Sequence, residues 1–211
     1  MAGATISSAA LAHGLNNYWA ASWPTSGPQN EILYDMTIGV PGGLGSSEHD
    51  HIAEGGKAWN QETDEILFKR SGDEVANFSP GACATHQSAI HYDELFGVVV
   101  GETVICGSGA TISGFQLTLD SLVPWWWSDS TVPNNYFDAQ SVATHEFGHA
   151  AGGWTNGTPE KHFDENNNAA LCGESVPNSD YHTMCAGNRK GTNHWRSVEL
   201  YDRHTFADAY P

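Results

Sequence analysis

Hydrophobic and polar residues alternate along the first part of this chain in a way that is typical of β-strands. In residues 31–38 every second side chain is apolar and falls on one face, which predicts a strand. Short apolar runs follow it, separated by the Gly, Ser, Pro and Asn clusters at which strands end. The further strands predicted in this way lie at residues 66–70, 89–92, 98–106 and 114–120.

Three other segments carry apolar residues at helical spacing. Residues 48–61 follow a Pro/Gly/Ser loop and predict an amphipathic helix. A second helix is predicted over Tyr136–Gly152, with Asn134 or Asn135 as its N-cap. A last helix is predicted from about residue 197 to 209.

The order of these elements indicates an α+β fold in one domain of 211 residues. We expect a sheet with helices in an N-terminal lobe at about 30–152, and an irregular C-terminal lobe at about 153–211 that ends in a helix. The three consecutive tryptophans at 125–127 end the sheet region. Adjacent residues cannot all face one way, so we expect these tryptophans to pack within a loop rather than to line a cleft.

The net charge of the chain narrows the range of binding partners that we expect. Eight basic residues against 25 acidic ones give a formal charge of −17, so neither nucleic acid nor an anionic membrane surface is an expected partner. No apolar run approaches the roughly 18 residues that span a bilayer. We expect a monomer whose acidity serves solubility.

The four cysteines are Cys83, Cys106, Cys172 and Cys185, and none forms a CxxC pair. Pairing Cys83 with Cys106 and Cys172 with Cys185 closes the shortest loops, which favours two disulfides over four free thiols. Disulfides imply an oxidising compartment. The first 15 residues contain no basic residue, so we expect no secretory signal in the sequence as it stands, and a secreted protein would be a processed form.

The candidate chemistry lies in the pentapeptide HEFGH, within the second predicted helix. His145 and His149 are four residues apart, so both imidazoles lie on one helix face and can reach one metal ion. Glu146 between them can act on a water beside that ion. Zinc fits this pattern, because catalytic zinc takes three protein ligands and keeps one open position. The alternative is a pair of solvated surface histidines.

These residues resemble the metzincin metallopeptidases, whose signature is HExxHxxGxxH followed by a turn that contains Met. Gly152 stands at the position of the family glycine, and Met184 in His182-Thr183-Met184-Cys185 resembles the Met-turn beneath the zinc. The most similar branch is the matrixin-like, collagenase-type one, especially its short secreted bacterial members. The resemblance implies a zincin-like fold with a twisted, mostly parallel sheet.

The third zinc ligand departs from the strict family spacing, which falls on Thr155. The next histidine is His162, and an outward loop between the helix end and a returning strand can lengthen without moving either anchor. We therefore predict His162 as the third ligand, with Glu160 and Asp164 as alternatives.

The resemblance implies a zinc endopeptidase in which Glu146 is the general base for a metal-activated water. We expect its protein or peptide substrate to lie extended along an exposed sheet edge, most plausibly at residues 114–120, with side-chain preference set beside His149 and residues 181–190.

Two other function classes stay open. One is a binding or structural module that holds zinc without cleaving anything, and the other is a gluzincin-type hydrolase with Glu174 or Glu199 as ligand. A structural zinc at His86 and His91, or a structural calcium ion at residues 164–168, is chemically conceivable, but ordinary solvated or packed positions are preferred.

Overall fold

The structure is a computed structural model of the whole chain. It describes residues 4–7, 22–24, 30–36, 46–71, 88–97, 99–108, 111–152, 161–163, 169–171, 183–184, 190–199, 202–203, 206 and 210, of which 4–7, 46–47, 161–163 and 169–171 are described by their backbone alone.

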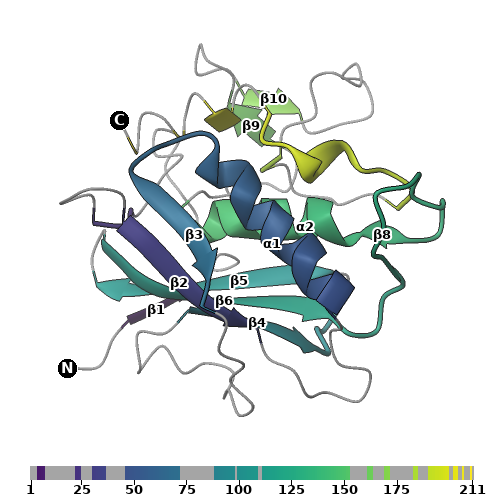
Figure 1. Cartoon of the computed structure of the whole chain (residues 1–211), viewed down its shortest axis with the longest axis horizontal. Coiled ribbons are helices and arrows are strands. Elements are labelled where there is room, and N and C mark those ends of the chain that lie inside the picture. Colours follow the sequence, from purple (N-terminus) through teal and green to yellow (C-terminus); the bar gives the residue numbers. More distant parts are fainter. Residues whose placement is uncertain are drawn as a thin grey trace.

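A six-stranded, mostly parallel sheet forms the base of the molecule, in the order β1-β5-β6-β4-β2-β3 (Figure 1). Strands β3, β2, β4 and β6 are mutually parallel, with β3 at the edge of the sheet. Beyond β6, strand β5 pairs antiparallel with both β6 and β1. The strands are β1 (Ala4–Ser7), β2 (Asn30–Met36), β3 (Ile66–Arg70), β4 (Ser88–Asp93), β5 (Gly101–Ser108) and β6 (Thr111–Asp120).

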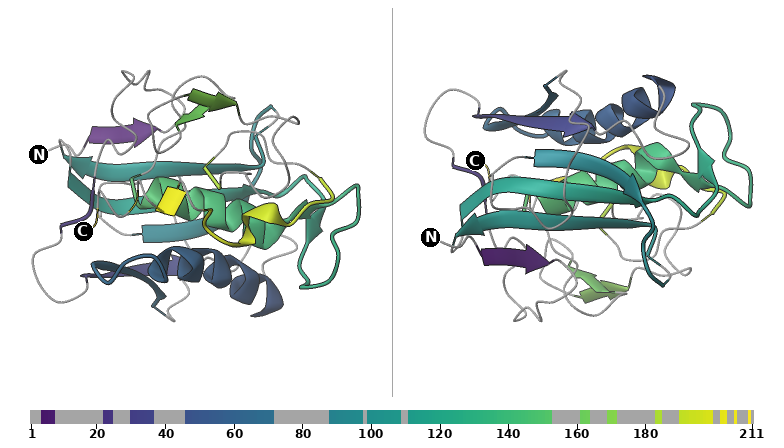
Figure 2. Two further views of the ribbon diagram at one scale, coloured as in Figure 1. Left: turned by 90° about the horizontal axis from the view of Figure 1, so that it is seen from above. Right: turned by 90° about the horizontal axis from the view of Figure 1, so that it is seen from below.

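Both long helices lie on the same face of this sheet. Helix α1 (Ser46–Asn60) connects the parallel strands β2 and β3 and packs on β3, while α2 (Ala139–Ala150) packs on β5 and β6. The views in Figure 2 show α2 over the middle of the sheet, with α1 beside it. The predicted α+β class is confirmed.

The two helices approach closely at a glycine of α1. A Cβ on Gly55 would lie 2.7 Å from the backbone nitrogen of Thr144, so only glycine fits at this crossing. Next to it, Trp59 donates its indole N–H to the Thr144 carbonyl at 2.6 Å. These contacts fix α1 against the middle of α2.

An aromatic cluster joins α2 to the sheet. The Phe147 ring lies 5.2 Å from Tyr34, 5.0 Å from Phe68 and 5.8 Å from Phe115, centroid to centroid, in tilted or edge-on arrangements. All four side chains are buried. Because Phe147 occupies the centre of the HEFGH pentapeptide, this packing aims the neighbouring His and Glu side chains away from the aromatic core.

The C-terminal end of α2 is closed by residues from both ends of the chain. Trp23 donates its indole N–H to the Ala150 carbonyl at 2.9 Å, and the Tyr210 hydroxyl donates to the Ala151 carbonyl at 2.5 Å. Gly152 follows with φ of 105°, a left-handed conformation that stops the helix. The last carbonyls of a helix need such partners when they are buried.

Three details differ from the sequence predictions. Residues 114–120 lie inside β6, between β4 and β5, so they form no exposed edge and the predicted substrate edge is wrong. Helix α2 begins at Ala139 with Asp138 as its N-cap, not Asn134 or Asn135, because Phe137–Asp138 forms strand β8 beside β7 (Trp125–Trp126). The strand β1 was not predicted.

The remaining described elements are short. A small hairpin consists of β9 (Lys161–Phe163) and β10 (Ala169–Leu171), and η2 (His194–Arg196) is a single 3-10 turn. Near the predicted last helix, Asp202, Arg203 and Phe206 are helical, and the Tyr210 amide bonds the Phe206 carbonyl. The tryptophan run was predicted to pack within a loop, but Trp125 and Trp126 form the short strand β7. Trp125 is buried and lies 5.9 Å from Trp127, centroid to centroid.

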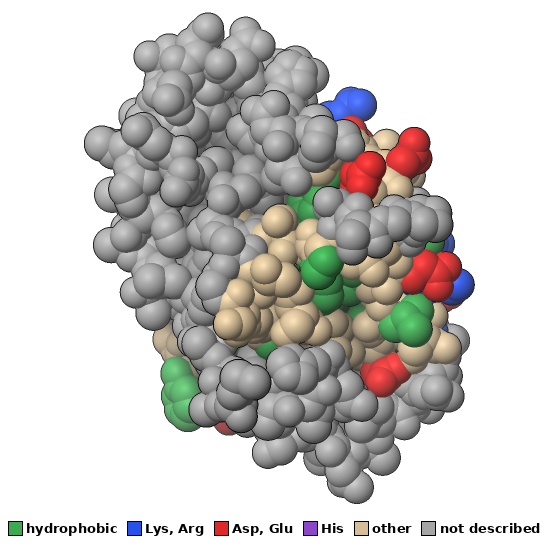
Figure 3. Space-filling model, turned by 90° about the vertical axis from the view of Figure 1, so that its left-hand side faces the viewer, with side chains coloured by type: hydrophobic (Ala, Val, Ile, Leu, Met, Phe, Trp, Pro, Cys, Tyr) green, Lys and Arg blue, Asp and Glu red, His purple; other side chains and the backbone are tan. Residues whose placement is uncertain are grey.

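No described helix is long and apolar enough to cross a membrane. Figure 3 shows one face of the molecule, on which the described acidic side chains lie along one edge with a few basic ones among them. Cys106 is buried and disulfide-bonded. Cys83, Cys172 and Cys185 lie outside the described residues, so the predicted pairing stays a prediction.

Candidate metal centre

The HEFGH pentapeptide occupies the last turns of α2, as the sequence predicts. His149 and Glu146 are buried, and His145 is half-buried. The α2 backbone places all three on the stretch of helix that packs against β5 and against Thr183 and η2 (His194–Arg196).

The imidazoles of His145 and His149 converge. Their Nε2 atoms lie 3.1 Å apart, and the rings are 4.7 Å apart and nearly perpendicular. Two imidazole nitrogens at this distance must share a proton or a cation, since their lone pairs would otherwise repel each other. Two nitrogens bound to one tetrahedral zinc at 2.0–2.1 Å would be about 3.3 Å apart, close to the observed separation.

The other nitrogen of His145 fixes the tautomer. Its Nδ1 lies 2.7 Å from the Thr183 carbonyl oxygen, which can only accept a hydrogen bond, so Nδ1 carries the proton. Nε2 is therefore left with a lone pair that points toward His149. A carbonyl oxygen behind a ligating histidine is the usual way in which proteins orient such a ligand.

Met184 packs against Gly148, the residue that precedes His149 in the helix. A Cβ on Gly148 would overlap the Met184 sulfur and lie 2.5 Å from the Trp59 ring, so the glycine between His145 and His149 is required for this packing. Asp202, fully buried, accepts a hydrogen bond from the Met184 amide at 3.3 Å. This hydrogen bond holds the turn at 183–184 in place.

One further side chain lies against the first histidine. Trp195 is nearly parallel to the His145 ring at 5.4 Å between centroids and is itself buried. The stack restricts rotation of the His145 ring, which complements the hydrogen bond to Thr183.

Glu146 points to strand β5. Its carboxylate Oε2 accepts a 2.7 Å hydrogen bond from the Thr103 hydroxyl, and both residues are buried. Burial raises the pKa of Glu146 to about 8, the Thr103 bond works in the lowering direction, and the nearby Glu102 charge raises it further. A divalent cation at the histidines would act in the opposite sense and favour the carboxylate form.

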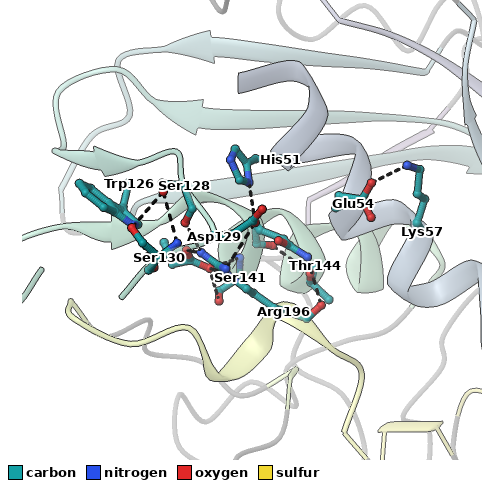
Figure 4. Close-up of polar contacts among 12 residues, drawn as sticks. His51, Glu54, Lys57, Trp126, Ser128, Asp129, Ser130, Ser141, Thr144 and Arg196 are labelled. Atoms are coloured by element: carbon teal, nitrogen blue, oxygen red, sulfur yellow. Dashed lines mark hydrogen bonds and ion pairs between the residues drawn. The ribbon is translucent and has the colours of Figure 1, made fainter. Parts of the chain in front are cut away.

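The beginning of α2 carries a different polar cluster, shown in Figure 4. The Asp138 carboxylate accepts from the Ser141 amide at 3.0 Å and from the Ser141 hydroxyl at 2.7 Å. Arg196 donates to both oxygens of Asp138, at 2.5 and 2.9 Å, and to the Ser128 carbonyl at 2.7 Å. The Asp138 hydrogen bond and charge raise the pKa of Arg196 above its ordinary value.

The other predicted ligands are placed less completely. The backbone of His162 lies in β9, opposite Ala170, but its side chain is not described. Glu160, Asp164, Glu174 and His86 lie outside the described residues. Glu199 is described, and its amide bonds the Thr183 hydroxyl at 3.0 Å. Within the described part of the chain, no three His, Cys, Asp or Glu side chains are grouped as a metal site, so the third ligand stays a prediction.

Sequence reasoning missed several residues that support the site, chiefly Thr103, Asp138, Trp195, Arg196 and Asp202. Thr103, Trp195, Arg196 and Asp202 are distant in sequence from the partners they support, and none belongs to a recognisable short motif. Only the N-cap had a local signal, because Asp138 stands three residues before Ser141, whose amide it accepts from.

Comparison with known proteins adds no family assignment. No protein-family model matches the chain, and no curated protein matches it significantly. The functional argument therefore depends on the geometry around His145, Glu146 and His149.

Proposed function

We propose that this protein is a zinc-dependent endopeptidase of the metzincin type, resembling the matrixin-like branch and acting outside the cell. The single observation that carries the proposal is the 3.1 Å convergence of the His145 and His149 Nε2 atoms, with the Nδ1 of His145 engaged by the Thr183 carbonyl. The carboxylate of Glu146 comes from the same two turns of helix.

The residues fit zinc. Two neutral imidazoles on a rigid helix suit this metal, and the backbone partner behind His145 together with the Met184 floor restricts where the nitrogens can go. His145, His149 and, as the predicted third ligand, His162 would hold the ion. Bound there, zinc would supply a Lewis acid that polarises a carbonyl and makes water more acidic.

Glu146 is the proton carrier in this proposal. Its carboxylate accepts a proton from the attacking water and delivers it to the departing amine nitrogen, so one residue serves first as base and then as acid. Burial raises the pKa of Glu146 to about 8 when no cation is present, so the protonated form dominates at neutral pH, and a cation at the histidines would favour the carboxylate form that accepts the proton. No Ser or Cys nucleophile is needed.

A peptide would lie along the outer edge of β5 rather than along β6. Among the residues that the structure describes, β1 pairs with residues Val104–Gly107 of β5, and the part of β5 from Gly101 to Thr103, next to Glu146, lies beyond that pairing. An extended substrate there would gain main-chain hydrogen bonds of the kind that are insensitive to sequence.

The test compares Glu146→Gln with the unaltered chain on an unfolded protein substrate, before and after chelation and after zinc is restored. We expect chelation and Glu146→Gln each to abolish cleavage, while the Glu146→Gln variant still binds one zinc ion per chain. Glu54→Gln, a half-exposed glutamate of α1, is the matched control and should cleave normally.

Two outcomes would contradict the proposal. Cleavage by the Glu146→Gln variant at the normal rate would show that Glu146 is not the general base. Stoichiometric zinc in an unaltered chain that cleaves no peptide bond would favour the alternative of a zinc-holding binding module.

A further inference from the structure

The strand β5 contributes two residues to the surroundings of a single carboxylate. Gly101 and Thr103 are two positions apart and therefore face the same side of the sheet, the side on which α2 packs (Figure 1). Both lie against Glu146, and neither belongs to the HEFGH pentapeptide.

Thr103 holds one carboxylate oxygen of Glu146. Its hydroxyl is 2.7 Å from Oε2, and it also lies 3.1 Å from the Glu146 backbone carbonyl. The Thr103 side chain is fully buried, so water does not replace this contact easily. A hydroxyl has a single proton, and the carboxylate is the stronger of the two acceptors.

Gly101 leaves room for the other oxygen. A Cβ at this position would lie 2.9 Å from Glu146 Oε1, 3.0 Å from its Cγ and 2.9 Å from a methyl group of Val142. Any side chain here would push the carboxylate out of its position, since Val142 belongs to the same packed helix.

We propose that Thr103 and Gly101 position the general base, with Thr103 restraining Oε2 so that Oε1 is presented to the reacting water. This inference rests on the proposed function and deepens it, because it gives β5 a role in positioning the base beside its role as the substrate edge. Thr103 is a positioning residue that acts through Glu146 and does not itself touch substrate.

The first experiment measures the interaction energy between Thr103 and Glu146 and does not depend on catalytic activity. Urea unfolding of the metal-free full chain is followed for Thr103→Val, Glu146→Ala and the double variant. We expect the two substitutions to be non-additive, because each removes the same hydrogen bond. The control cycle uses Thr118→Val on β6, where Thr118 pairs with Glu102 and therefore lies on the opposite face of the sheet from Thr103, and it should be additive.

The second experiment measures the consequence in the zinc-loaded chain with a quenched fluorescent peptide that the unaltered protein cleaves. Thr103→Val should lower kcat about tenfold to a hundredfold, as expected for loss of a hydrogen bond to a charged group, with KM and zinc content unchanged. Thr103→Ser, which keeps the hydroxyl, should restore most of kcat. Gly101→Ala should lower kcat while zinc stays bound.

Additive unfolding energies in the Thr103 cycle would overturn the inference whether or not the protein is a peptidase. An unchanged kcat in Thr103→Val, or an equal loss in Val and Ser, would also overturn it. If the unaltered chain cleaves nothing although the cycle is non-additive, the proposed function fails and the contact between Thr103 and Glu146 stands.

Discussion

The two ends of α2 carry polar clusters of opposite kinds. At the N-terminal end, Asp138 accepts hydrogen bonds from Ser141 and Arg196, so donors of the chain itself surround its carboxylate. At the C-terminal end, two imidazole nitrogens of His145 and His149 face each other at 3.1 Å. One cluster is an ion pair between a carboxylate and a guanidinium, whereas the other joins two imidazoles within reach of a single cation.

This difference distinguishes a cluster held by an ion pair from the candidate metal centre. A buried ion pair with satisfied hydrogen bonds orders the loop at 124–138 and η2 around the start of the helix. The histidine pair is oriented differently, by the Thr183 carbonyl and the Trp195 ring at His145 and by Met184 packed against Gly148. Substitutions at the two ends should therefore affect different measurements.

The largest effect is expected at the histidine end. His149→Ala removes one of the two converging nitrogens, so zinc binding measured by competitive titration and cleavage of an unfolded protein should both be lost. His51→Ala is the matched control on α1, where the imidazole lies 4.0 Å from a carboxylate oxygen of Asp129. Normal zinc affinity in His149→Ala would mean that the histidine pair is no metal site.

Asp138→Ala tests the other end. It leaves the partly buried Arg196 without its main partner and removes the N-cap of α2, so the free energy of unfolding in urea should fall by about 3–5 kcal/mol. Asp129→Ala, which removes a 90% exposed carboxylate near the same Arg196, should change it little. Folded Asp138→Ala protein should keep its zinc affinity, and loss of zinc with unchanged stability would reverse the assignment of the two ends.

Gly148→Ala probes the floor beneath the histidines. The added methyl would collide with Met184 and with Trp59, whose indole is fixed by its bond to Thr144, so overpacking should cost about 1–3 kcal/mol of stability. Displacement of the 183–184 turn should also weaken zinc binding roughly tenfold or more, because the Thr183 carbonyl orients His145. Thermal unfolding and zinc titration measure the two effects, and an unperturbed variant would show that Met184 does not support the site.

His91 provides a smaller contrast, since it is a buried histidine that lies away from α2. Burial lowers its pKa to about 4, against a small opposing effect of Asp93. The folded protein then binds fewer protons than the unfolded chain between pH 6.5 and 4, so stability should fall as the pH falls through that range. His91→Gln should flatten this part of the curve of unfolding free energy against pH, and an unchanged slope would contradict the assignment to His91.

Much of the fold could be predicted because its signals are local. The strand at 66–70 was predicted to the residue, and the helix predicted at 48–61 is observed at 46–60, since apolar periodicity and flanking turns mark both. Strand order has no local signal, so the sequence predicts an exposed edge at residues 114–120, although β5 and β4 flank them. Pairing of β1 with β5 joins segments about a hundred residues apart and has no local signature.

The candidate site also has a part that the sequence predicts and a part that it does not. Spacing alone brings His145 and His149 together, because the helix period fixes it. Thr103, Asp138 with Arg196, and Trp195 reach their partners through tertiary packing, and sequence offers no rule for such contacts. The role of His162 follows from resemblance and not from a described contact.

The most direct test of the metal centre is X-ray absorption spectroscopy of the full chain after zinc loading and removal of excess metal. The account predicts one zinc ion per chain with imidazole nitrogens at about 2.0–2.1 Å, and loss of that signal in His149→Ala. A chain that retains no zinc, or zinc held without imidazole ligands, would contradict it.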